Sequence, residues 1–142
     1  MLIGDSTIDL ARYRAYPNLH FLGRKPYADL PAYCRHFDVG LIPFKVNDLT
    51  RSVNPIKLRE YLAAGLPVVS TPMPEVRQYN HLIRISDSVD SFIKAIEESL
   101  ADDSQARLRR SQSMRSESWP EKVATICDHL ERACRTGKES AR

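Results

Sequence analysis

The sequence predicts an α/β fold in which helices cover both faces of a parallel sheet, and three observations lead to this prediction. Short apolar runs alternate along the chain with segments of helical periodicity. The runs lack the strict alternation of apolar and polar residues that marks a sheet with one solvated face. After residue 102 only helical patterns continue, so helices should follow the sheet.

Five apolar runs are the expected strands: residues 2–3, 19–22, 39–43, 68–70 and 82–85. A sheet of this kind rarely begins with a strand of two residues, so Leu2-Ile3 is expected to be the end of a strand whose start lies upstream. We therefore expect the chain to be a fragment that is incomplete at its N-terminus.

Helices are expected between the strands, at about residues 29–36, 55–64 and 89–101. In the second of them, Asn54 suits the N-cap and Pro55 the first helical position, and Gly65 followed by Pro67 ends the helix. Beyond residue 104 we expect helices over 105–114 and 120–134, then a frayed tail over 135–142. Residues 1–134 would form one domain.

Composition excludes several classes of protein. The chain has 142 residues, 42% of them hydrophobic and 27% charged, which fits one globular domain and not a disordered chain. It has no apolar run long enough to span a membrane and no signal peptide, so we expect a cytosolic protein. The net charge is +3, and the arginines after residue 104 look like a solvated helix face, so we expect no nucleic-acid binding.

The cysteines point to no disulfide framework and no zinc site. Cys34, Cys127 and Cys134 are odd in number and form no C-x-x-C pair. They are expected to be reduced and mostly buried thiols, and no metal is expected anywhere in the chain.

The segment after the third strand is the candidate site. In an open parallel sheet, ligands bind where strands end and helices begin. A polar loop over residues 44–54 leads there into the helix at Pro55, and Lys57 adds a positive charge to the first turn, which suits a diphosphate. Glu60 lies one turn further on the same side, where its carboxylate could accept hydrogen bonds from two sugar hydroxyls. The alternative is that Lys57 and Glu60 form only a surface ion pair.

Residues 54–71, followed by Pro74-Glu75-Val76, resemble the donor-binding motif of the family 4 ("group 1") glycosyltransferases. Residues 18–23, 30–33 and 37–44 resemble segments that precede this motif in the family, so the resemblance covers about residues 1–130. No G-x-S-x-G elbow and no phosphate-binding loop of the G-x-x-x-x-G-K-[ST] or G-x-G-x-x-G type competes with it.

The resemblance implies a Rossmann-like domain, the C-terminal half of the GT-B fold, which binds a nucleotide-diphosphate sugar. The family reaction is a metal-independent transfer that retains the anomeric configuration. Carried over to this chain, Glu60 would hold the ribose hydroxyls, and Asn54 and Lys57 would face the diphosphate. The loop that contains Arg24, Lys25 and Tyr27 would lie against the base. No catalytic residue is assigned.

The chain departs from the family pattern at Ser52, where many members have a glutamate that faces the transferred sugar. Here Ser52 and Val53 would contact the sugar through hydroxyl and backbone groups. The family's acceptor domain and its preceding βα unit are absent from this chain. We therefore expect the isolated chain to be inactive. Its glycan or lipid-linked acceptor should bind the missing domain, and any peripheral membrane contact should map to that domain. The alternatives are a non-catalytic nucleotide-sugar-binding partner subunit and an inactive remnant. The apolar stripe of helix 120–134 would be exposed and prone to self-association.

Overall fold

A computed structural model of the protein describes residues 1–139, with side chains as far as Arg135. The described chain forms two compact units, Met1–His36 and a second unit that begins at Phe37. No change of composition along the chain marks this division, because the break falls between a short helix and the third apolar run. Each unit is described below by itself.

The first unit consists mostly of loops. It contains the 3₁₀ helices η1 (Ala11–Tyr13) and η2 (Tyr27–Asp29) and the α-helix α1 (Leu30–Cys34). The expected strands at 2–3 and 19–22 reduce to one parallel bridge between Leu2 and Phe21, in which the Leu2 amide donates to the carbonyl of His20 at 2.8 Å. Two segments that pair without a third strand bury too little surface to extend the ladder.

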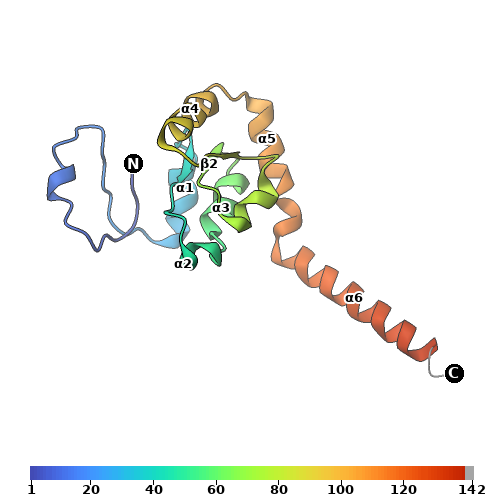
Figure 1. Cartoon of the computed structure of the whole chain (residues 1–142). Coiled ribbons are helices and arrows are strands. Elements are labelled where there is room, and N and C mark those ends of the chain that lie inside the picture. Colours follow the sequence, from blue (N-terminus) through green and yellow to red (C-terminus); the bar gives the residue numbers. More distant parts are fainter. Residues whose placement is uncertain (140–142) are drawn as a thin grey trace. The chain divides into compact units, whose positions relative to one another are not determined.

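The second unit holds a sheet of three parallel strands in the order β1-β2-β3, with β1 at Gly40–Ile42, β2 at Val68–Ser70 and β3 at Arg84–Ile85 (Figure 1). Gly40 is in register with Val68, and Val69 with Arg84. All three strands fall within predicted apolar runs, which confirms the predicted α/β class with a parallel sheet.

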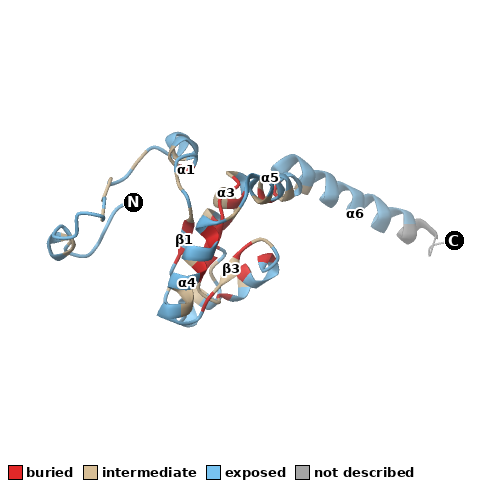
Figure 2. Cartoon of the chain, turned by 90° about the horizontal axis from the view of Figure 1, so that it is seen from above, coloured by how far each residue is buried: buried red, intermediate tan, exposed pale blue. Residues whose placement is uncertain are grey.

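Helices cover both faces of β2, whose three side chains are all fully buried. The helices α3 (Ile56–Ala63) and α4 (Val89–Leu100) both pack against this strand. The buried core cluster includes two residues of α3 and none of α4, and Figure 2 shows the buried residues gathered around the sheet. Its members are Ile42, Leu58, Leu62, Val68, Met73, Val76, Tyr79, Ile83 and Met114.

Side-chain caps explain where several helices begin. A capping box between Ser88 and Ser91 starts α4, and the Asp103 carboxylate accepts from the Ala106 amide at the start of α5 (Ser104–Ser113). A capping box between Asn47 and Thr50 starts the short helix α2 (Asp48–Arg51), which the sequence analysis treated as loop.

In the second unit, two 3₁₀ helices were also not predicted, η3 (Pro74–Tyr79) and η4 (Arg115–Glu117). The last helix, α6 (Trp119–Glu139), continues beyond the predicted end at residue 134 into the segment expected to be frayed. Residues 140–142 of that predicted tail lie outside the described residues. In the described part of the chain, no helix combines the length and the hydropathy needed to cross a membrane.

Two expectations were wrong in detail. Asn54 is not the N-cap of α3: the helix begins at Ile56 with Pro55 in the capping position, because the Asn54 side chain is bound elsewhere. Only one of the three cysteines, Cys34, is buried, whereas Cys127 and Cys134 are exposed on α6. The reason is that the apolar stripe of α6 has no cover among the described residues.

Candidate functional site

A cleft of ≈ 520 Å³ lies at the carboxyl ends of the three strands, where ligands bind in open parallel sheets. It is formed by residues that follow β1, β2 and β3. They are Phe44, Lys45, Val46, Arg51, Thr71, Pro72, Pro74, Arg77 and Asp87.

Two threonines hold the loops around this cleft. The Thr71 hydroxyl, after β2, donates to the carbonyl of Phe44, after β1, at 2.7 Å. The Thr50 hydroxyl in α2 donates to the carbonyl of Lys45, also at 2.7 Å. Backbone carbonyls of the β1–α2 loop are thereby satisfied by side chains, which fixes the loop against the sheet edge.

The cleft is electropositive. Three of its side chains are cations, namely Lys45, Arg51 and Arg77, and one is an anion, Asp87. Arg51 also approaches Asp48 at 3.5 Å, but both side chains are largely exposed, so this pair is weak. The excess of positive charge favours an anionic ligand.

Lys57 lies beside this cleft. Its ammonium is 4.8 Å from the centroid of the Phe44 ring, and Phe44 lines the cleft. This cation–π contact places a positive charge at the first turn of α3, whose N-terminus carries the positive end of the helix dipole. A positive charge therefore lies at the start of α3, and the expected role of Lys57 toward a diphosphate stays a prediction.

Glu60 follows Lys57 by three residues on α3 and is partly buried. At this spacing the two side chains share one side of the helix. Ser52 is exposed at the end of α2, and Val53 is partly buried in the connection between α2 and α3. Ser52, Val53 and Glu60 thus belong to the segment after β1 that also contributes Phe44, Lys45, Val46 and Arg51 to the cleft, although none of the three is part of the cleft lining.

Asn54 is bound to Arg59, a residue that no motif in the sequence marks as functional. The Arg59 guanidinium donates through Nη1 to Oδ1 of Asn54. The same guanidinium approaches Glu75 at 3.5 Å and Glu117 at 3.3 Å, and it lies 5.6 Å from the ring centroid of Tyr79. These contacts make Arg59 a hub that joins Asn54, Glu75, Glu117 and Tyr79. No local signal in the sequence reveals this hub, because Glu117 is 58 positions away from Arg59.

The hub has electrostatic consequences. Partial burial lowers the pKa of Arg59, but Tyr79, Glu117 and Glu75 together outweigh it, so the pKa is raised. The pKa of Glu117 is lowered, first by a hydrogen bond from Lys122 and then by Arg59, against the effect of burial. Both groups therefore stay charged throughout the neutral range.

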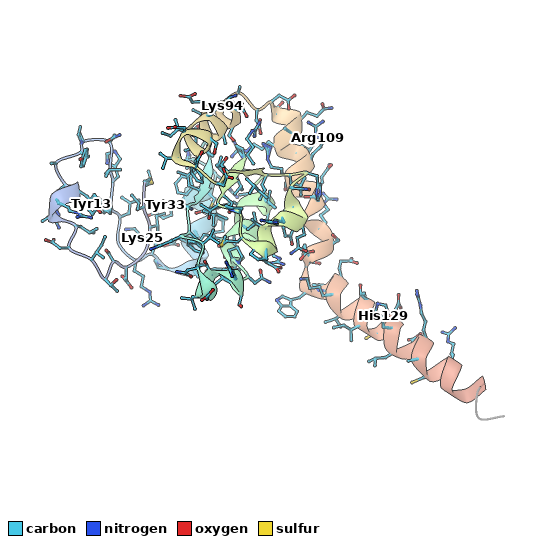
Figure 3. The ribbon with its side chains drawn as sticks, in the orientation of Figure 1. Tyr13, Lys25, Tyr33, Lys94, Arg109 and His129 are labelled. Carbon is cyan, nitrogen blue, oxygen red and sulfur yellow. The ribbon has the colours of Figure 1, made fainter. Side chains whose placement is uncertain are left out.

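The other three predicted donor-binding residues, Arg24, Lys25 and Tyr27, belong to the first unit. Figure 3 labels Lys25 there. Arg24 and Tyr27 are exposed, and Lys25 is partly buried. That unit has its own cavity of ≈ 540 Å³, lined mainly by apolar residues between Leu2 and Gly23, and none of the three residues lines it. Their expected role against a base stays a prediction.

Among the described residues, no group of three or more His, Cys, Asp or Glu side chains could hold a metal ion.

Comparison with known proteins identifies the family. The sequence model of the family described as "Glycosyl transferases group 1" matches residues 1–102. The chain is also 32% identical over 110 residues to a Bacillus subtilis (strain 168) protein named "Putative teichuronic acid biosynthesis glycosyltransferase TuaH". That alignment covers 72% of this chain but only 28% of the relative. With its parallel sheet, its motif over 54–76 and this match, the chain belongs to the group 1 glycosyltransferases.

Proposed function

We propose that this chain is the donor-binding part of a glycosyltransferase and that its ligand is a nucleotide-diphosphate sugar. The observation that carries the proposal is the segment from Phe44 to Glu60. It joins an electropositive cleft at the sheet edge to a helix N-terminus, with Lys57 in the first turn and a carboxylate one turn later. Diphosphate and ribose hydroxyls are the groups that such an arrangement recognises.

The roles follow from the chemistry of each side chain. Glu60 accepts hydrogen bonds from the ribose hydroxyls, while Lys57 and Asn54 face the diphosphate. Ser52 and Val53 contact the transferred sugar through hydroxyl and backbone groups. Arg24, Lys25 and Tyr27 contribute to the binding of the base.

The reaction we propose is transfer of the glycosyl group to an acceptor with retention of configuration and without a metal ion. The leaving group is the nucleoside diphosphate, and stabilising its developing charge is the main task of the site. Lys45, Arg51 and Arg77 supply positive charge at the cleft, and Lys57 supplies it at the helix N-terminus.

The acceptor, we propose, is a glycan or a lipid-linked glycan that is bound mainly outside these 142 residues, in line with the limited share of the relative that the chain spans. The relative's name refers to biosynthesis of teichuronic acid, which supports a place in polysaccharide biosynthesis. On this proposal the enzyme works in the cytoplasm, with any membrane contact made by the acceptor-binding part.

The apolar stripe on α6 fits an interface. Val123, Ile126 and Leu130 are 52%, 58% and 62% exposed, and Trp119 is 80% exposed. On an isolated chain such a stripe favours self-association.

Calorimetric titration with UDP, GDP, ADP and their sugar conjugates tests the donor site. We expect one nucleotide to bind, and Glu60→Ala to weaken it by about 1–3 kcal/mol, the cost of lost hydrogen bonds to a charged group. Glu97→Ala is the matched control, because Glu97 is an exposed carboxylate on α4, away from the cleft lining. Its affinity should equal that of the unmodified chain.

The alternatives give different results. A partner subunit without catalytic function would bind the nucleotide in the same way but would support no transfer when an acceptor-binding domain is supplied. An inactive remnant would bind none of the nucleotides although it folds. The serine at position 52 is compatible with this alternative, whereas Asn54, Lys57 and Glu60 argue against it.

A further inference from the structure

We propose that Arg59 is a positioning residue for the donor diphosphate, and that it acts by fixing the orientation of the Asn54 side-chain amide. The inference rests on the proposed donor function and adds to it a residue that does not itself touch the donor.

The Asn54 side-chain amide is held in one orientation. An asparagine presents one carbonyl oxygen, an acceptor, and one NH2 group with two donors. In this protein Oδ1 accepts from Nη1 of Arg59. That contact fixes the rotation of the side-chain amide, with Oδ1 turned toward Arg59. The NH2 group is left for another partner. An anion requires donors, so the orientation set by Arg59 is the one that suits a phosphate.

Arg59 is itself held in place by contacts with several elements. Its guanidinium reaches three elements: the connection before α3 through Asn54, η3 through Glu75 at 3.5 Å, and η4 through Glu117 at 3.3 Å. The side chain is 24% exposed, and the Tyr79 ring lies 5.6 Å away. A planar guanidinium that is already paired at several points loses little additional conformational entropy when it binds one more acceptor.

Asn54 does not act as the N-cap of α3. Asn54 was expected to satisfy backbone amides at the start of α3, and in that role its oxygen would serve the helix. The structure instead gives α3 no side-chain cap. The Leu58 amide donates to the Pro55 carbonyl at 2.9 Å, so the amides of Ile56 and Lys57 are the ones left for a ligand. The Asn54 NH2 group and these amides would then act on the same anion.

The test compares a nucleoside diphosphate with its nucleoside, using the whole chain and the nucleotide that binds best in the titration above. Arg59→Lys keeps a positive charge near the two carboxylates but lacks the fork that reaches Asn54. We expect it to weaken the diphosphate about tenfold, the effect of one lost hydrogen bond to a charged group, and to leave the affinity for the nucleoside within about twofold. In an Asn54→Ala background the same substitution should change neither affinity.

Arg109→Lys is the matched control, because it makes the same exchange at an exposed arginine of α5 that has no contact with Arg59 or Asn54. It should leave both affinities unchanged. The proposal is overturned if Arg59→Lys weakens nucleoside and diphosphate equally, or if it weakens the diphosphate as much in the Asn54→Ala background. If the unmodified chain binds no nucleotide, the donor function itself fails, and this inference fails with it.

Discussion

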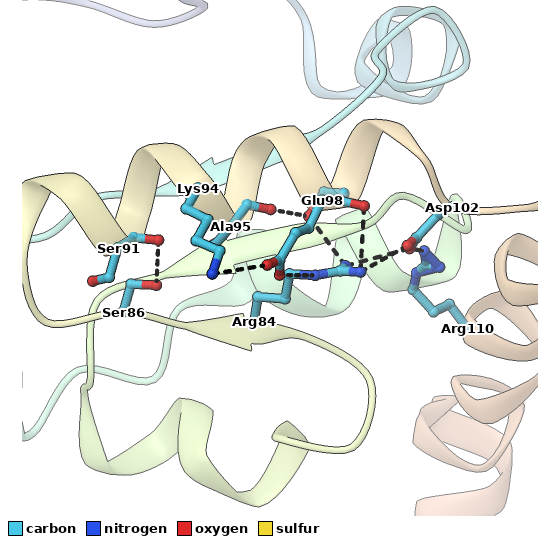
Figure 4. A network of polar contacts seen from close by, with 9 residues as sticks. Arg84, Ser86, Ser91, Lys94, Ala95, Glu98, Asp102 and Arg110 are labelled. Carbon is cyan, nitrogen blue, oxygen red and sulfur yellow. Dashed lines mark hydrogen bonds and ion pairs between the residues drawn. The ribbon is translucent and has the colours of Figure 1, made fainter.

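Arg84 donates a hydrogen bond to Oδ1 of Asp102 at 2.9 Å, which joins strand β3 to the turn after α4. Figure 4 shows that the same carboxylate also receives Arg110, a side chain of α5 that is only 5% exposed. Arg110 in turn donates through Nε to the carbonyl of Leu66 at 3.2 Å, just before β2. One carboxylate therefore connects β3, α5 and the start of β2, and it holds the helical end of the unit on the sheet.

The first prediction is that Asp102→Asn lowers the free energy of unfolding by about 3 kcal/mol at neutral pH, because it leaves the buried Arg110 without a counterion. Burial raises the pKa of Asp102, but hydrogen bonds and charge from Arg84 and Arg110 outweigh this, so its pKa is lowered. As the pH falls below about 5, the Asp102 carboxylate therefore binds a proton in the unfolded chain before it does so in the folded chain. The free energy of unfolding decreases over this range, until the pH falls below the pKa of Asp102 in the folded chain.

Urea unfolding between pH 3 and pH 7 measures both effects. The unmodified chain should lose stability on acidification more steeply than Asp102→Asn, because the variant has no carboxylate to titrate at this position. Asp128→Asn on exposed α6 is the control and should follow the unmodified chain. Parallel pH curves for the Asp102 variant and the unmodified chain would show that the pair does not stabilise the fold.

The second prediction concerns Gly65, which ends α3 with a φ of +77°. A Cβ atom there would lie 2.7 Å from Cγ of Arg107 and 2.8 Å from its backbone carbonyl oxygen. Gly65→Ala should therefore cost about 2 kcal/mol or more, from left-handed strain and from displacement of α5. Faster hydrogen exchange in α5 would report that displacement.

Gly23→Ala provides the comparison, because Gly23 has a similar φ of +65° but nothing within 4 Å of an added Cβ. It should show only the strain, about 1 kcal/mol, with unchanged exchange in α5. Equal effects of the two substitutions would mean that the close approach to Arg107 is not a constraint.

Periodicity was sufficient to predict the sheet and most helices of the second unit. The strand at Val68–Ser70 and the helix that begins after Ser88 were predicted within one residue of their ends, because a buried apolar run and helical periodicity are local signals. The first unit was predicted less well. Its pairing of Leu2 with Phe21 depends on partners distant in sequence, and Leu2 is still 48% exposed.

For the candidate site, the sequence predicted the segment but not its internal contacts. The charge of Lys57 at the start of α3 could be read from the motif, whereas its position over Phe44 depends on how the loop after β1 folds back. The engagement of Asn54 by Arg59 was missed because the hub depends on Glu117, far along the chain. Long-range ion pairs leave no periodic pattern in a sequence.

The third prediction is that the isolated chain self-associates through α6. Ile126 and Leu130 are 58% and 62% exposed and lie four positions apart, on one side of the helix. Light scattering should give a mass above that of a monomer, and the double substitution Ile126→Glu with Leu130→Glu should restore the monomer by placing charges in the interface. Thr125→Gln, on another side of α6, should leave the mass unchanged. A monomeric unmodified chain that binds no hydrophobic dye would refute this expectation.

The fourth prediction assigns the charge of Lys57 to the diphosphate. Lys57→Met keeps an unbranched apolar chain over the Phe44 ring but removes the ammonium that lies 4.8 Å from its centroid. We expect nucleoside diphosphate binding to weaken by about 1.5–3 kcal/mol, the size of a hydrogen bond to a charged group, and nucleoside binding to stay nearly constant. Calorimetry at two salt concentrations measures this, and the salt dependence should be smaller in the variant.

The control for Lys57→Met is Lys94→Met, which removes an exposed ammonium from α4 whose nearest carboxylate, Glu98, is 3.9 Å away. This variant should bind both ligands as the unmodified chain does, because Lys94 is outside the cleft lining. A loss of diphosphate affinity that is equal in the two variants would reflect only the net charge of the protein. A loss confined to Lys57→Met would place the phosphate groups at the first turn of α3, beside the electropositive cleft.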